Sequence, residues 1–242
     1  KHVFEGFMGA KSRENPANTK PVGTGPYKIV DFKPGDTLRA EANTSYHVAN
    51  QPFFDALELK GGGDALSAAR AVLQTNEYDV AWNLAVEDEL LKRLETAGKG
   101  KVTFYAGSDV EMVILNASDP WTEVDGERAS VKSKHPAFSE KAVREAMSLL
   151  MDRKGMADVI YGRGAIATAN FLNNPPRFVS KNVKHEFNVE KANRILEGAG
   201  WKKGPDGIRA KGNAKLKFVF QTSVSGPRQK AQAIIKAACT SA

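Results

Sequence analysis

The sequence predicts an α/β protein with two lobes, the second of them incomplete. Strand and helix patterns alternate over residues 1–118, a long polar stretch fills residues 119–136, and helix patterns dominate over residues 137–242. Alternation of strands with helices is typical of α/β folds. A polar segment of this length is uncommon inside a compact domain, so we expect the chain to change lobes there.

The first strands follow a bend rich in glycine and proline. The sequence PVGTGP at residues 21–26 leads into an apolar strand pattern at residues 27–32. The turn signal Pro34-Gly35-Asp36 separates this pattern from an alternating run at residues 37–43. Two strand patterns joined by a short turn predict a β-hairpin.

The Gly23-Thr24-Gly25 motif could instead suggest a phosphate-binding loop. Such a loop connects a strand to the N-terminus of a helix, whereas here irregular chain precedes the glycines and a strand pattern follows them. Pro26 also lacks the amide N–H that a phosphate would need. The motif therefore predicts a structural bend. The sequence GRGAIA at residues 162–167 follows a helix rather than a strand, which likewise excludes a dinucleotide-binding turn.

Strands and helices continue to alternate over the rest of the first part. Strands are expected at residues 56–60, 78–82, 102–106 and 111–116, and helices after Asp64 and around residues 90–94. The last of these strands contains the run MVIL, which is apolar throughout. A strand without alternation is typically buried on both faces, so we expect it near the centre of a sheet.

Four helices are expected in the second part of the chain. Their patterns begin at Ser139, Asp152, Asn188 and Pro227, residue types that are favoured at helix N-termini. One hairpin is expected before the last helix, with its second strand around residues 216–220. A single hairpin is too little sheet for four helices to cover, so the second lobe is predicted to be incomplete.

Composition narrows the class of protein. The formal net charge is +7, from 35 Lys and Arg against 28 Asp and Glu, but the basic residues are spread along the chain and form no nucleic-acid-binding arm. The single cysteine, Cys239, excludes an internal disulfide and a cysteine-rich metal site. No apolar run approaches the ~20 residues that cross a bilayer. The first residues lack a signal-peptide pattern, so the protein is either cytosolic or its leader has been removed.

The motifs indicate neither an enzyme nor a metal site. The histidines lie far apart in polar contexts, lack metal-ligand spacing and are expected to be solvated: His2, His47, His135 and His185. The acidic run at residues 119–127 lacks the pattern of a calcium loop. No serine lies in a nucleophile elbow. We therefore expect a binding protein without catalytic residues, metal or cofactor.

Four segments fit the motifs of one family in the same order. The segment PVGTGPYKIVDFKPGDTLRAEANTSYH, residues 21–47, closely resembles a signature of the peptide- and nickel-binding family (family 5) of extracytoplasmic solute-binding proteins of ABC importers. Residues 64–82 resemble the family's helix and the strand entry that follows it, here Glu77-Tyr78-Asp79. HPAFSEKAVREAMSLLMDRKGM at residues 135–156 and FNVEKANRILEGAGW at residues 187–201 are similar to later helices of the family.

The resemblance implies a periplasmic-binding-protein-like two-lobe α/β fold, of which this chain is a middle fragment. Residues 1–118 would form part of lobe one as a mixed α/β sheet, residues 119–136 a crossing loop, and residues 137–242 the helix-rich first part of lobe two. Family members are much longer. They also hold the amino terminus of a peptide with an acidic residue beyond the point where this chain ends, so no residue here is assigned that role.

A transport function is also implied by the resemblance. The protein would capture an extended peptide between its lobes and deliver it to the permease subunits of an ABC importer. It would act as a monomer in the periplasm, or on the outer face of the cytoplasmic membrane if it is a lipoprotein. Nickel chelates, opines and oligosaccharides are alternative ligands within the family. A basic scaffold that binds nucleic acid is the alternative from another class.

Ligand contacts are expected at strand ends and in an irregular segment. Trp82 and Asn83 lie where a predicted strand ends, which is a usual position for a ligand cleft in an α/β sheet. Asn116 ends the apolar strand before the crossing. Asn170 and Phe171 lie in an Asn- and Pro-rich segment that the resemblance places facing the cleft.

Overall fold

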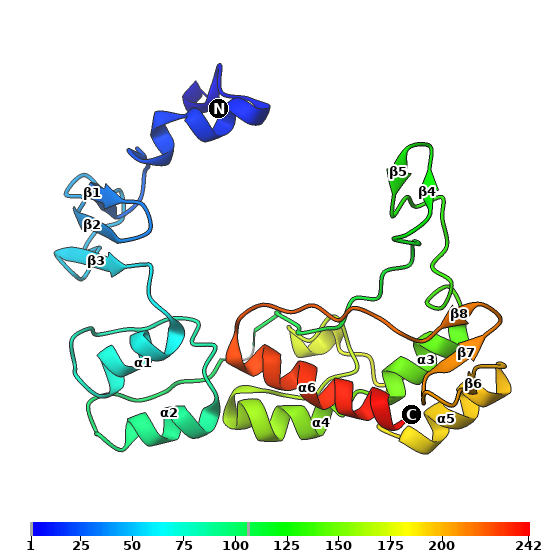
Figure 1. Ribbon diagram of the computed structural model, residues 1–242. Helices are drawn as coiled ribbons and strands as arrows, with labels where there is room; N and C mark the ends of the chain where they lie inside the picture. The colour runs from blue at the N-terminus through cyan, green and yellow to red at the C-terminus, as the bar shows by residue number, and fades with distance from the viewer. Residues whose placement is uncertain (1, 106) are drawn as a thin grey trace. The chain divides into compact units, whose positions relative to one another are not determined.

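The computed structural model describes residues 2–105 and 107–242, and the chain divides into two compact units with the boundary after Ala68. Figure 1 shows the elements of both units, and each unit is considered by itself. The α-helices of the described residues are α1 (Ala65–Leu73), α2 (Asp88–Glu95), α3 (Lys141–Leu149), α4 (Arg153–Met156), α5 (Val189–Gly198) and α6 (Gly226–Ser241).

Short helical turns and strands complete the described structure. The helical turns are η1 (His2–Phe4), η2 (Gly9–Glu14), η3 (Pro16–Asn18), η4 (Ala157–Tyr161), η5 (Gly162–Gly164) and η6 (Pro176–Phe178). The strands are β1 (Tyr27–Lys33), β2 (Thr37–Ala42), β3 (Ala56–Lys60), β4 (Glu123–Val124), β5 (Glu127–Arg128), β6 (Lys202–Lys203), β7 (Arg209–Lys211) and β8 (Ala214–Lys215).

An antiparallel sheet in the order β1-β2-β3 lies in the first unit. The predicted hairpin is confirmed as β1 and β2, in which Ile29 pairs with Ala40. Ala40 in turn pairs with Leu57 of β3, and Leu38 with Leu59. Side chains that lie directly opposite each other on an antiparallel pair share a face of the sheet. Ala40 of β2 therefore lies on the same face as Ile29 of β1 and Leu57 of β3. Ala40, in the central strand, is only 4% exposed.

The glycine-rich bend before β1 is held by one asparagine. The backbone N–H of Asn43 donates to the carbonyl of Pro26 at 2.8 Å. Its side-chain amide donates to the carbonyl of Gly25 at 3.0 Å. A strand follows the bend, as predicted, and a helix N-terminus does not. The interpretation of residues 23–25 as a structural bend is therefore confirmed.

Helices α3 and α5 pack against each other around the main core of the second unit. Their apolar residues recur every three or four positions, so that each helix presents one apolar face. Trp201, which directly follows α5, is fully buried in this core, and its indole N–H donates to Glu140 at 3.2 Å. The buried members of the core are Ala137, Phe138, Val143, Ala146, Leu149, Leu150, Ala192, Leu196, Trp201 and Ala242.

The caps of α5 explain why this helix could be predicted. The side chain of Asn188 accepts a hydrogen bond from the backbone N–H of Lys191 at 2.8 Å, which is an N-cap contact. Gly200 follows the helix with φ of +89°, a conformation that glycine adopts without strain. The predicted N-terminal residue and the predicted closing glycine are both confirmed.

Buried Arg209 joins three elements of the second unit. Its guanidinium donates to the carbonyl of Trp201 at 2.8 Å, to the carbonyl of Ala242 at 2.8 Å and to the side chain of Asn193 at 2.7 Å. These bonds connect β7 to α5 and to the end of α6. The pattern of the sequence did not predict this contact, because its partners lie up to 33 residues away.

Several predicted strands are absent from the described residues. Residues 78–82, 102–105, 111–116 and 216–220 form no ladder, and residue 106 of the predicted strand 102–106 lies outside the described residues. Strand propensity reflects packing against neighbours as much as backbone preference. No partner strand runs beside these segments in the described structure, so the pattern alone does not make them strands.

The polar stretch 119–136 contains a small hairpin, β4–β5, in place of a plain loop. Its turn residues Asp125 and Gly126 have φ of +53° and +79°, as a tight hairpin turn requires. Figure 1 shows this hairpin projecting from the helices of the second unit. The second unit includes residues on both sides of the stretch, and its assignment as the crossing between two lobes stays a prediction.

His135 is buried, so the expectation that it is solvated is wrong. Its Nδ1 accepts hydrogen bonds from the backbone N–H groups of Ala137 at 3.1 Å and Phe138 at 3.0 Å. Its ring stacks on Phe138 and lies 5.8 Å from the ring of Trp121. Burial lowers the pKa of His135, against a smaller opposing effect of Asp119. The neutral imidazole therefore accepts hydrogen bonds from the backbone at the edge of the core around α3 and α5.

Candidate functional site

A cavity of about 2810 Å³ lies among residues 83–242 of the second unit. Four of the five predicted ligand residues line it: Asn83, Asn116, Asn170 and Phe171. Trp82 is adjacent in sequence but does not line the cavity. This volume exceeds the ~300–1,000 Å³ that is typical of pockets for drug-sized ligands, because the cavity is open to solvent and extends along much of the second unit.

Residues 110–116 form one wall of the cavity. Burial alternates along this segment: Val113 and Leu115 are half-buried, while Met112 and Ile114 are 53% and 83% exposed. The expectation of a strand buried on both faces is therefore wrong. The segment is an apolar run of which one side remains accessible.

The backbone of this wall has capacity for hydrogen bonds. Within the described residues, no backbone hydrogen bond involves the N–H or C=O groups of residues 110–116. Backbone N–H and C=O groups are strong hydrogen-bonding groups, and along this largely exposed segment they are accessible to water or to a ligand. An extended ligand that lies along the segment could supply the missing partners in the manner of an added strand.

Asn116 has one end of its side-chain amide engaged. Its Oδ1 accepts hydrogen bonds from the backbone N–H of Ser118 at 3.1 Å and from the Ser118 hydroxyl at 2.9 Å. This turn fixes the side chain at the end of the cavity wall. Its Nδ2 has no hydrogen-bond partner in the described part of the chain and can donate to a ligand.

Asn170 holds its own loop together. Its side chain accepts from the backbone N–H of Ser180 at 2.9 Å and donates to the carbonyl of Ser180 at 3.2 Å. Its backbone N–H donates to the Thr168 hydroxyl at 3.0 Å. Both ends of the amide are therefore occupied by the loop. The neighbouring Phe171 is 70% exposed and is the better placed of the two to contact a ligand.

Trp82 and Asn83 lie at a backbone position of restricted geometry. Asn83 has φ of +57°, in the left-handed region that few residues other than glycine adopt. Such conformations are concentrated at functional sites, where the surroundings impose them. Trp82 is 88% exposed. The ligand roles of all five residues stay predictions.

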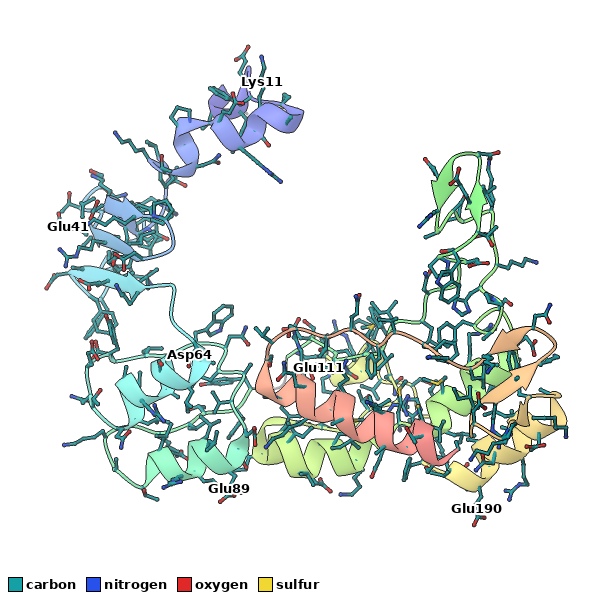
Figure 2. All side chains as sticks on the ribbon, viewed as in Figure 1. Lys11, Glu41, Asp64, Glu89, Glu111 and Glu190 are labelled. Atoms are coloured by element: carbon teal, nitrogen blue, oxygen red, sulfur yellow. The ribbon has the colours of Figure 1, made fainter. Side chains whose placement is uncertain are left out.

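A polar cluster on the cavity wall was not predicted from the sequence. Glu111, labelled in Figure 2, accepts a hydrogen bond from Nε of Arg228 at 2.9 Å and another from the hydroxyl of Tyr161. All three residues line the cavity. Burial and the Glu111 carboxylate raise the pKa of Tyr161, so its hydroxyl stays protonated and can donate. The residues are 50 and 117 positions apart, and no local motif marks them.

Arg163 forms a second cluster with two carboxylates. Its Nε donates to Asp88 at 2.8 Å, its backbone N–H donates to Asp88 at 3.0 Å, and its Nη2 donates to Glu95 at 2.8 Å. Its guanidinium also lies over the ring of Phe104, 5.2 Å from the centroid. A Cβ on Gly162 would lie 2.4 Å from the Asp88 carboxylate, so only glycine permits this approach.

The charge state of Asp88 follows from these contacts. Burial, the largest influence, acts to raise its pKa, but the hydrogen bonds from Arg163 and Lys92 together outweigh burial and hold the pKa below its ordinary value. Glu95 also has a lowered pKa, first because of the backbone N–H of Val102 and then because of Arg163. Both carboxylates are therefore charged at neutral pH and pair with one guanidinium.

Neither a metal cluster nor a membrane-spanning helix was found in the described ranges 2–105 and 107–242. No group of three or more His, Cys, Asp or Glu side chains in these residues is arranged to hold a metal ion. None of the helices there is long and apolar enough to cross a membrane.

The comparison with known families identifies the chain. The family model of the bacterial extracellular solute-binding proteins, family 5 Middle, matches residues 3–238. The chain belongs to this family. The four segments that resemble the family, residues 21–47, 64–82, 135–156 and 187–201, all lie inside the matched range.

Individual family 5 proteins are similar over most of this chain. The oligopeptide-binding protein AppA of Bacillus subtilis is 29% identical over 229 residues, which cover 92% of this chain and 38% of AppA. Lactococcal OppA, solved in the closed conformation with an endogenous peptide, has a TM-score of 0.68 at 16% identity. The matched region covers 97% of this chain and 43% of the OppA chain. NikA of Brucella suis, solved with Fe(III)-EDTA, has a TM-score of 0.64 at 22% identity, and the matched region covers 91% of this chain and 42% of the NikA chain.

These likenesses confirm the fold class. The chain has the fold of part of a two-lobe α/β solute-binding protein, and it spans 38% of the length of AppA. The family as a whole consists of extracellular solute-binding proteins. The predicted family and the predicted incomplete fold are therefore both confirmed.

Proposed function

We propose that this chain is the middle part of a solute-binding protein that captures an extended peptide and delivers it to the permease of an ABC importer. The observation that carries the proposal is the wall formed by residues 110–116. It combines backbone groups that have no hydrogen-bond partner in the described structure with exposed apolar side chains. Asn116 is part of this wall, and three more predicted ligand residues, Asn83, Asn170 and Phe171, line the same cavity.

The shape and lining of the cavity support a peptide of variable sequence. Main-chain hydrogen bonds would supply affinity that does not depend on the ligand's side chains. Exposed apolar residues of the lining, among them Tyr105, Ile114 and Phe171, offer contacts to side chains of many kinds. Ordered water can fill the remaining space without a large loss of affinity. An oligopeptide forms main-chain hydrogen bonds and apolar side-chain contacts at the same time.

Other ligands remain as competitors within the same family. A nickel chelate, an opine or an oligosaccharide would be held by a small number of placed polar groups, whereas an extended peptide pairs with a continuous row of backbone groups. A nucleic-acid scaffold would need a concentrated basic surface, whereas the ion pairs of this chain engage many of its basic residues, including Arg163, Arg209 and Arg228. The backbone wall favours the peptide.

The proposal includes the setting in which the protein works. We place it in the periplasm, or on the outer face of the cytoplasmic membrane if it carries a lipid anchor, as a monomer that passes its ligand to the permease subunits. Closure of two lobes over the ligand would present the recognised form to the permease. No catalytic step, cofactor or nucleic-acid partner is part of this role.

Calorimetry on the full-length protein tests the ligand class. The probes are a pentapeptide mixture, a nickel–histidine chelate, an opine, an oligosaccharide and a DNA duplex. We expect binding of the peptides at micromolar or lower Kd and no measurable heat from the other probes. Tight binding of one of the other probes, with no binding of peptide, would contradict the proposal. A DNA signal would be examined for its salt dependence, which phosphate contacts make steep.

A matched pair of variants relates this signal to the cavity. Phe171→Ala removes an exposed aromatic ring from the lining and should weaken peptide binding about tenfold. Phe178→Ala removes an aromatic ring that is 52% exposed but does not line the cavity, and it should leave the affinity unchanged. Equal effects of the two changes would place the ligand elsewhere.

A further inference from the structure

Ion pairs connect residues 83–118 to residues 137–242 within the second unit, and the acidic partner always lies on the same side. In the described structure, every ion pair between residues 83–118 and residues 137–242 has its acid in the first part and its base in the second: Asp88–Arg163, Glu95–Arg163, Glu111–Arg228 and Glu87–Lys230. The two parts therefore meet with complementary charge. Complementary patches accelerate encounter and fix the register of the surfaces that meet.

The pairs differ in their access to water. The Asp88 side chain is 4% exposed and lies at the centre of the Arg163 cluster. Glu111 and Arg228 are 51% and 54% exposed, whereas Lys230 is 57% exposed and its partner Glu87 only 20%. An exposed pair contributes little to stability because water and salt screen it. The Glu111–Arg228 pair can therefore break and re-form without leaving a charge buried and unpaired, because both of its partners are exposed.

The position of the pairs relates them to ligand binding. Glu111 lies on the same wall as Ile114, and Arg163 precedes the loop that carries Phe171. A change in the distance between the acidic and the basic part would therefore change the width of the cavity between these residues.

We propose that these charges form the closing contact between the lobes, with the acidic set on lobe one and the basic set on lobe two. The proposal rests on the two-lobe function proposed above. In the closed form, Arg163 with its two carboxylates fixes the register, assisted by the partly buried Glu87–Lys230 pair, and the exposed Glu111–Arg228 pair forms and breaks as the lobes move. Each lobe therefore contacts the other lobe of the same molecule through these charges.

Charge reversal tests the proposal, because a swapped pair restores the attraction that a single reversal removes. The variants are Glu111→Arg, Arg228→Glu and the double swap, made in the full-length protein. Spin labels on Arg93→Cys and Lys181→Cys, both exposed, report the distance between the two parts after Cys239→Ala and the replacement of any cysteine outside residues 1–242. Pulsed electron spin resonance then gives the distance distribution without ligand.

We expect each single reversal to shift the distribution to longer distances and the double swap to return it toward that of the unmodified protein. Lys230→Glu should act in the same direction as Arg228→Glu, and thermal melting checks that each variant is folded. Glu190→Arg is the matched control, because its partner Arg194 lies in the same helix and the pair does not cross between the parts. This control should leave the distances unchanged.

Peptide affinity provides the second readout. Each single reversal should weaken binding of the pentapeptide mixture about tenfold, and the double swap should recover it. Folded single reversals that keep the unmodified distance distribution would overturn the inference, as would a double swap as open as the single variants. The distances are measured without ligand, so a failure of the closing contact is distinguishable from a failure of the peptide proposal.

Discussion

The full-length protein is expected to bind a peptide about a hundredfold or more tightly than the isolated 242-residue chain. The chain spans 38% of AppA, so we propose that further walls of the cleft come from residues outside it. A ligand on a half-open surface keeps contact with water, which weakens each hydrogen bond relative to an enclosed site. A loss of several kcal/mol of binding free energy corresponds to a hundredfold or larger loss of affinity, because each ~1.4 kcal/mol is a factor of ten.

Calorimetry with one pentapeptide mixture on both proteins measures the difference. Far-UV circular dichroism of the isolated chain is the control for folding, with the helices α3, α5 and α6 as its main contributors. We expect weak binding or none by a folded isolated chain. Equal micromolar affinity of the two proteins would mean that the site lies entirely within residues 1–242.

Replacement of Trp201 is expected to have the largest effect on stability. Trp201→Ala should lower the free energy of unfolding by about 3–5 kcal/mol, the usual cost of truncating a buried aromatic residue. The ring is fully buried between α3 and α5, and its N–H donates to Glu140. The change removes this hydrogen bond and leaves a cavity that the surrounding helices can fill only in part.

Urea denaturation of Trp201→Ala and Trp82→Ala compares two tryptophans of opposite exposure. Trp82 is 88% exposed, so its replacement should change the free energy of unfolding by no more than ~0.5 kcal/mol. Similar losses for the two variants would contradict the assignment of the core around α3 and α5.

Elements with local signals could be predicted from the sequence. The hairpin β1–β2 was marked by its turn and its alternation, and α5 by Asn188 at its start and Gly200 after its end. These signals act within a few residues and need no distant partner. The family was also predicted, because its motifs are contiguous segments.

Strands without partners could not be predicted in the same way. Residues 111–116 and 216–220 have apolar patterns typical of strands, yet neither forms a ladder in the described structure. Pairing depends on a second segment that local sequence does not specify. Burial of His135 depends in part on a distant residue in the same way: besides Trp121 and Phe138, its ring contacts Phe218, which lies 83 positions further along the chain.

The candidate site also contains residues that local sequence could indicate and residues that it could not. Asn83, Asn116, Asn170 and Phe171 were selected from strand ends and loop composition, and all four line one cavity. The ion pairs of Arg163 and Lys230 join residues 75 and 143 positions apart, which no local pattern indicates. Only the folded chain brings these charges together.

Photo-crosslinking tests most directly whether an extended peptide lies along the wall at residues 110–116. A benzophenone amino acid replaces Ile114 or Phe171 in the full-length protein, with Val131 as the control because it is 95% exposed and does not line the cavity. After illumination with a bound peptide, mass spectrometry should find peptide adducts at positions 114 and 171 and none at 131. A protein that binds the peptide but forms no adduct at either cavity position would contradict the proposed site.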